Sequence, residues 1–118
     1  MMIIQNKSKQ QEIKQSMRGG KGDIEITHIT GSEILGNNCR LFAQITVKPG
    51  DSIGEHQHVG EREIFYFLQG HGIAIDNGKQ SEIGPGDVMV TPDQSSHSVV
   101  NTGDEDLVFM ALILNENS

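Results

Sequence analysis

Two histidines and a glutamate lie close together in residues 50–70, which read GDSIGEHQHVGEREIFYFLQG. His56 and His58 are separated by one residue, and Glu63 follows five positions after His58. Because residues i and i+2 of a β-strand point to the same face, both imidazoles are expected to face one space. Two imidazoles and a carboxylate can bind a divalent first-row metal and leave coordination positions open for other ligands.

A third histidine lies in a second polar stretch, residues 86–101, which read GDVMVTPDQSSHSVVN. His97 is expected to begin a short strand after a polar loop. An imidazole arriving from this separate strand would complete a site of three histidines and one glutamate. His28 and His71 stand outside both stretches and do not share the pattern.

Composition limits the classes of protein to which the chain can belong. Its 118 residues predict one domain, with residues 19–118 as the folded unit and residues 1–18 as an arm, flexible or exchanged in a dimer. A net charge of −7 disfavours nucleic acid and anionic membranes as partners, because both attract clustered Lys and Arg. No stretch approaches the ~20 apolar residues of a membrane span, and no signal peptide is expected. The single cysteine, Cys39, cannot form an intramolecular disulfide and favours a reducing, cytoplasmic location.

Short apolar runs alternate with turn signals such as KPGD, DNGK, GPGD and NTGDED. This spacing predicts an all-β sandwich or barrel. The expected strands are residues 24–29, 40–47, 63–68, 72–75, 80–83, 87–91, 97–101 and 107–114. The first seventeen residues would form either a helix or a flexible arm, because their apolar spacing is irregular.

The last expected strand, LVFMALIL at residues 107–114, is apolar on both faces. A single small core covers one face of a strand, so the second face is predicted to contact another subunit of a homodimer. Alternatively, this strand is central in a sandwich and is covered by the N-terminal arm.

The first stretch resembles the first sequence motif of the cupin superfamily at every motif position. The matching residues are Gly50, His56, His58, Glu63 and Gly70. The two motifs together cover about a third of the chain, and the hairpin expected between them suits small microbial cupins. Such proteins are often called oxalate-decarboxylase-like.

The second stretch resembles the second cupin motif through Gly86, Pro92, His97 and Asn101. One residue departs from it, because Gln94 stands where the family usually has a glycine that serves a loop turn. The departure concerns the conformation of the loop rather than the metal ligands.

The resemblance implies a jelly-roll β-barrel, the double-stranded β-helix of the cupin type, around a central pocket. It also implies a homodimer and one divalent transition metal, Mn, Fe, Ni, Co or Zn. The implied ligands are His56, His58, Glu63 and His97.

Further residues are candidates for lining the pocket. Phe65 and Phe67 share the parity of Glu63 and would form a hydrophobic wall. Glu55, Glu61 and Arg62 flank the metal ligands and are expected to be solvated, at the rim of the pocket.

The strand at residues 40–47 leaves two arrangements open. If its even positions face inward, Arg40 or Gln44 would hold an anionic substrate. If they face outward, the odd positions fill the core, and burial favours this second arrangement. Those odd positions are Leu41, Ala43, Ile45 and Val47.

A narrow barrel restricts the ligand to a small molecule of a few carbons. The leading hypothesis is a metal-dependent enzyme acting on a small carboxylate, a keto or hydroxy acid, or a sugar, by decarboxylation, oxygenation or isomerisation. The alternative is a non-catalytic module that uses the metal to bind a carboxylate or sugar. A metal-free barrel is the weakest of the three hypotheses.

Overall fold

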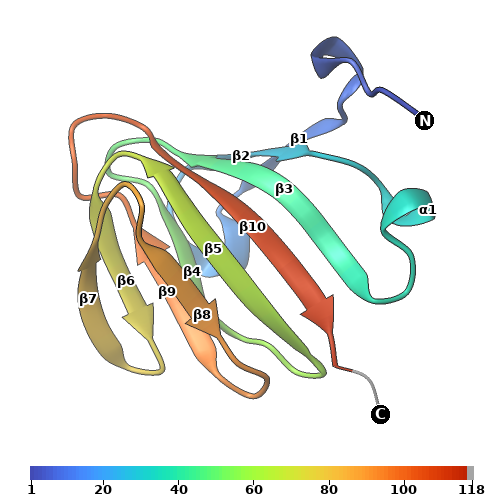
Figure 1. Ribbon diagram of the computed structural model, residues 1–118. Coiled ribbons are helices and arrows are strands. Elements are labelled where there is room, and N and C mark those ends of the chain that lie inside the picture. The colour runs from blue at the N-terminus through green and yellow to red at the C-terminus, as the bar shows by residue number, and fades with distance from the viewer. Residues whose placement is uncertain (117–118) are drawn as a thin grey trace.

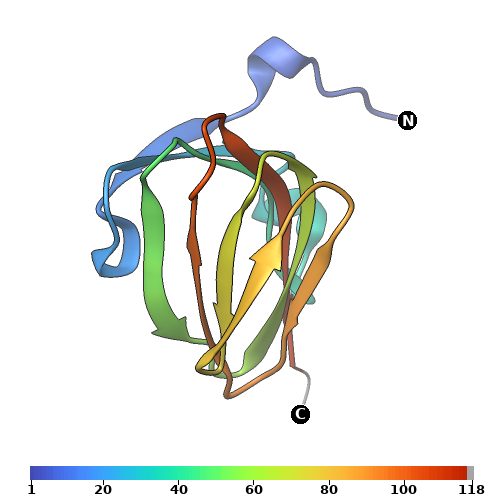
Figure 2. The same ribbon diagram turned by 90° about the vertical axis from the view of Figure 1, so that its left-hand side faces the viewer.

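Two antiparallel β-sheets face each other across a shared interior (Figures 1 and 2). The computed structural model describes residues 1–116. The six-stranded sheet has the order β1 (Gln11–Gln15), β2 (Asp23–His28), β3 (Cys39–Val47), β10 (Leu107–Asn115), β5 (Glu61–Gln69) and β8 (Val88–Thr91). The four-stranded sheet has the order β4 (Ser52–Gln57), β9 (Ser96–Val100), β6 (Gly72–Asp76) and β7 (Lys79–Ile83). The predicted all-β jelly roll is therefore confirmed.

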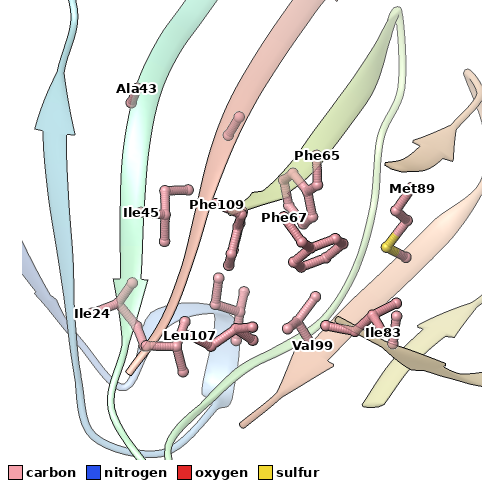
Figure 3. Close-up of a cluster of buried hydrophobic side chains, with 14 of the residues drawn as sticks. Ile24, Ala43, Ile45, Phe65, Phe67, Ile83, Met89, Val99, Leu107 and Phe109 are labelled. Atoms are coloured by element: carbon pink, nitrogen blue, oxygen red, sulfur yellow. The ribbon is translucent and has the colours of Figure 1, made fainter. Parts of the chain in front are cut away.

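Period-two alternation places one face of each central strand in the core. Strand β5 buries Phe65 and Phe67, and β10 buries Leu107 and Phe109. Figure 3 shows the three phenylalanine rings gathered beside one another, and their ring centroids lie 4.5 to 6.2 Å apart. Each such buried side chain contributes about 1.5–3 kcal/mol through the hydrophobic effect, so the core fixes the strands that carry the candidate site.

The N-terminal segment differs from the helix or flexible arm that its sequence suggested. Residues Gln11–Gln15 form β1, which pairs antiparallel with β2 and opposes Ile13 to Glu25. Ile13 is 59% exposed, so the ladder to β2, rather than side-chain burial, places this edge strand. The chain before β1 extends away from the barrel (Figure 2).

Three short helical segments complete the fold: η1 (Asn6–Ser8), η2 (Met17–Gly19) and α1 (Ser32–Leu35). Within residues 1–116, no helix has the length and apolar character needed to cross a membrane.

Strand β10 lies between β3 and β5, and its outward side chains are half-buried. The large apolar side chains that remain exposed on this face belong to the neighbouring strands β5 and β8. They are Tyr66, Leu68, Val88 and Val90, each 43% to 58% exposed. The expected homodimer interface is thus better centred on β5 and β8 than on β10 alone, and it stays a prediction.

Candidate metal centre

The four predicted ligands come from three strands in two sheets. His56 lies on β4 and His58 directly follows that strand, while His97 lies on β9 and Glu63 on β5. Strands β4 and β9 pair with His56 opposite His97. The register of this pair shifts between Ile53 and His56. Such a bulge redirects side chains. His56 faces His97 across the ladder, and the ligand atom of His58, just beyond the strand, lies close to both.

The ligand atoms converge within 4.8 Å of one another. Nε2 of His97 lies 3.0 Å from Nε2 of His58 and 3.1 Å from Nε2 of His56. Oε1 of Glu63 lies 2.9 Å from Nε2 of His58 and 3.1 Å from Nε2 of His97. Two ligands bound to one ion at about 2.1 Å and at right angles are about 3.0 Å apart, so these separations suit a common ion.

The other ring nitrogen of each histidine has its own partner. Nδ1 of His56 donates to the Gly54 carbonyl at 2.8 Å, and Nδ1 of His58 donates to Oε2 of Glu61 at 2.6 Å. Nδ1 of His97 pairs with the Thr91 hydroxyl at 2.7 Å. A carbonyl and a carboxylate only accept, so the neutral rings of His56 and His58 carry their proton on Nδ1 and direct an Nε2 lone pair inward.

Lone pairs that face a carboxylate at about 3 Å require a positive charge among them, either a proton or a metal ion. His58, Glu63 and His97 are each less than 5% exposed, so water does not screen them. This donor set therefore fits a divalent transition metal on its chemistry as well as its spacing.

Electrostatics keep the acidic groups of the site ionised. Burial raises the pKa of Glu63, but hydrogen bonds from His58 and His97 outweigh it, and the net pKa is lowered. Hydrogen bonds from Arg40, reinforced by His58, lower the pKa of Glu61 from 4.5 to about 2.

The pKa values of His56 and His58 are shifted in opposite directions. The hydrogen bond to Glu63 raises the pKa of His58, whereas burial lowers the pKa of His56. Burial therefore favours the neutral form of His56, whereas the Glu63 carboxylate favours a positive charge, a proton or a metal ion, beside His58.

A cavity of about 550 Å³ adjoins the ligand cluster. Three of the ligands, His56, His58 and Glu63, line it. Residues of β1, η2, β2 and β3 line it as well. The cavity therefore lies between the candidate metal ligands and residues of the N-terminal segment.

Of the four residues predicted to line the pocket, two line the cavity and two do not. Phe65 lines the cavity and stacks on His97 at a centroid distance of 5.0 Å. Phe67 instead lies fully buried in the core against Phe109 and does not line the cavity.

On β3, the odd positions face inward, as burial favoured. Gln44 is consequently turned outward, opposite Met110, and does not line the cavity. Arg40 does line it, although it shares the parity of Gln44. The register between β3 and β10 shifts beside Arg40, between Cys39 and Leu41, and such an irregularity re-aims a side chain.

Glu61 is the site residue that sequence reasoning missed, because a solvated rim position was expected. Its side chain is only 13% exposed, and it accepts two hydrogen bonds of 2.8 Å from Arg40. The signal was its spacing three residues after His58, across a turn containing Gly60, which has φ of 77°. Thr91 and the N-terminal cavity wall gave no comparable signal.

The loop before β9 keeps its turn without the usual glycine. Gln94 adopts φ of 73°, in the left-handed region that favours glycine. Its backbone N–H donates to the His58 carbonyl at 2.7 Å, and its own carbonyl accepts from the Gln57 side chain at 2.7 Å. The turn therefore forms with Gln94 in place of glycine, and its backbone hydrogen bond ties the loop to His58.

Comparison with known proteins agrees with this geometry. The family model described as Cupin domain matches residues 43–113. A protein from Thermotoga maritima named an oxalate-binding protein is 44% identical over 113 residues, which cover 96% of this chain and 93% of that protein.

Solved structures give the same family. A crystal structure from Thermotoga maritima described as a predicted oxalate decarboxylase has a TM-score of 0.91 and 44% identity, covering 97% of this chain and 99% of that chain. A polyketide cyclase from Streptomyces resistomycificus has a TM-score of 0.78 at 20% identity, covering 97% and 79%, which shows the fold alone. With the family model spanning more than half of its length and these relatives spanning nearly all of it, the chain belongs to the cupin family.

Proposed function

We propose that this cupin holds one divalent transition metal through His56, His58, Glu63 and His97, and binds a small dicarboxylate of the oxalate type at the metal. The observation that carries the proposal is the convergence of four buried or half-buried donor atoms within 4.8 Å, beside a cavity. The ligand set suits Mn, Fe, Ni, Co or Zn. When bound, such a metal supplies a Lewis acid with positions open to oxygen ligands.

Two observations support a dicarboxylate. The relative that is 44% identical is named an oxalate-binding protein. The cavity wall also carries three cationic side chains, Lys14, Arg18 and Arg40. Lys14 and Arg40 are paired with Glu12 and Glu61, and among the described residues Arg18 forms no ion pair. Cations gathered around a cavity of an acidic protein favour an anionic ligand.

Capture of the ligand, without its conversion, is the role that the cavity residues support best. A catalyst for decarboxylation or isomerisation needs a positioned acid or base with freedom to exchange a proton. Glu61 is engaged by Arg40 and His58. Farther along the wall, Glu12 and His28 contact each other at 3.6 Å. Among the described residues that line the cavity, no uncommitted acid or base lies beside the ligand cluster.

An enzymatic role stays the second candidate, because a relative's structure is described as a predicted oxalate decarboxylase. Decarboxylation of oxalate releases carbon dioxide and formate, which separates this role from capture. The metal-loaded protein is expected to bind oxalate and return it unchanged. Formation of formate in proportion to enzyme concentration would establish the decarboxylase instead.

Metal analysis tests the proposal directly. The purified protein is expected to contain about one transition metal ion per chain, and His58→Ala is expected to lose most of it. His71→Ala is the matched control, because His71 is exposed and lies outside the ligand cluster. Elemental analysis showing equal metal in wild type and His58→Ala would refute the metal assignment. Titration calorimetry with oxalate, with and without metal, then tests the ligand.

The homodimer and the cytoplasmic location belong to the same proposal. Exposed apolar residues on β5 and β8 support the first, and the single half-buried Cys39 supports the second.

A further inference from the structure

We propose that Arg18, carried by an N-terminal strap of residues 11–22, is the residue that makes the site selective for a dianion over a monoanion. The inference rests on the proposed function. In it, a metal held by His56, His58, Glu63 and His97 would supply positions for one side of a dicarboxylate, and the Arg18 guanidinium would bind the carboxylate oxygens on the other side.

The strap is docked on the strand that carries His56. A Cβ atom at Gly54 of β4 would overlap the carbonyl of Arg18, and a Cβ at Gly20 would overlap the carbonyl of Ser52. Both positions therefore need glycine for the two backbones to approach this closely. The strap lies against β4 because neither chain has a side chain between them.

Hydrogen bonds fix this contact. The backbone N–H of Ser52 donates to the Lys21 carbonyl at 3.0 Å, and the Lys21 N–H donates to the Ser52 hydroxyl at 3.0 Å. Within the strap, the Ser16 N–H donates to the Gly22 carbonyl at 2.9 Å. The loop that presents Arg18 is thus closed on itself and anchored to β4.

The backbone of this loop adopts conformations that cost free energy. Arg18 has φ of 55° and Ser16 has φ of 50°, both in the left-handed region. A non-glycine residue there costs about 1–2 kcal/mol, and such conformations cluster at ligand sites. A loop that only connected β1 to β2 would gain stability from glycine at position 18.

Charge distinguishes Arg18 from the other cations of the cavity wall. Arg40 is neutralised by Glu61 at 2.8 Å, and Lys14 lies 4.0 Å from Glu12. Within the part of the chain that the structure describes, Arg18 forms no ion pair. A lining guanidinium without a carboxylate partner is available to an incoming anion.

Arg18 lines the same cavity as His56, His58 and Glu63. The strap that carries Arg18 is docked on β4, the strand that carries His56. A dicarboxylate in this cavity can therefore reach both the candidate metal ligands and the Arg18 guanidinium. A guanidinium presents a planar fork of donors that matches a carboxylate, so it binds oxygens that point away from the metal.

Titration calorimetry on the zinc-loaded protein tests the inference, because zinc has no redox chemistry of its own. The variant is Arg18→Asn, since asparagine tolerates the left-handed backbone at this position. The control is Lys79→Asn, which removes the same charge from an exposed position on β7, outside the cavity. Oxalate and acetate serve as dianion and monoanion.

Loss of charged hydrogen bonds predicts that Arg18→Asn weakens oxalate binding about 10- to 100-fold. Acetate binding and zinc affinity should each change less than about 3-fold, and Lys79→Asn should change oxalate affinity less than about 2-fold. Arg18→Lys, which keeps the charge but loses the fork, should weaken oxalate binding by an intermediate factor.

The outcomes separate the inference from the function on which it rests. Zinc-loaded wild type that does not bind oxalate would refute the proposed ligand and this inference with it. Wild type that binds oxalate while Arg18→Asn binds it equally well would overturn the role of Arg18 alone. Equal losses for oxalate and acetate would show a general charge effect and would also overturn selectivity for the dianion.

Discussion

Replacing Glu61 by Gln isolates the contribution of an outer hydrogen bond to metal binding. Within the cluster, Glu61 contacts His58 alone, and its Oε2 lies 2.6 Å from Nδ1 of that histidine. Arg40 donates two hydrogen bonds to the same carboxylate. The carboxylate fixes the His58 tautomer and increases the electron density of the ring, which strengthens Nε2 as a ligand. A glutamine at this position cannot accept from Arg40 and His58 with both of its terminal atoms.

The expected loss of metal affinity for Glu61→Gln is about 10- to 100-fold, or about 1.4–2.7 kcal/mol. The measurement is a competition titration of the apoprotein with a chromophoric chelator at neutral pH. Glu55→Gln is the matched control, because Glu55 is an exposed glutamate on β4, one residue before His56. It removes the same charge from the neighbourhood without removing a partner of a histidine.

Two results would refute this reasoning. Metal affinity unchanged in Glu61→Gln would show that the hydrogen bond to His58 does not support the ligand. Equal losses in Glu61→Gln and Glu55→Gln would show that net charge near the site, rather than the orientation of His58, sets the affinity.

Two further predictions concern acid stability and assembly. The pKa of Glu61 is about 2 in the folded protein against an ordinary value of 4.5, so its contribution is present above pH 4.5 and is lost as pH falls toward 2. The shift corresponds to about 3 kcal/mol, and urea denaturation of the apoprotein across this range should show a smaller pH dependence in Glu61→Gln than in wild type. Light scattering at micromolar concentration should give a dimer, and Val90→Lys, at a position 50% exposed on β8, should shift it toward the monomer. A wild-type monomer at that concentration would contradict the homodimer.

The ligand cluster was predictable from sequence because its members obey short-range rules. His56 and His58 are two positions apart, and Glu63 and Phe65 are two positions apart on the next strand, so each pair shares one face. The eight strands expected from apolar runs all form, and each places at least one apolar side chain in the common core. In these segments the apolar sequence pattern and the packing of the core both favour the same strand.

The rest of the site, formed by β1, Arg40 and Glu61, depends on contacts that produce no periodic pattern in the sequence. Strand β1 reads QEIKQ and is held at an edge by its ladder to β2, so no burial pattern marks it as a strand. Arg40 reaches the cavity through a local shift of register, against the parity of β3. From sequence alone Glu61 is indistinguishable from a surface charge, because its partner Arg40 lies 21 residues earlier in the chain. Such pairings are decided by tertiary structure, and local sequence does not encode them.

The distribution of the ligands between the two sheets has a mechanical consequence. Three of the four candidate ligands belong to the four-stranded sheet: His56 on β4, His58 just after β4, and His97 on β9. Only Glu63 comes from the six-stranded sheet. An ion at this position would fasten the two layers together through a single carboxylate. Separating the layers at that end would break the coordination, and release of the ion would free the layers to separate, so partial unfolding and metal loss would be one event.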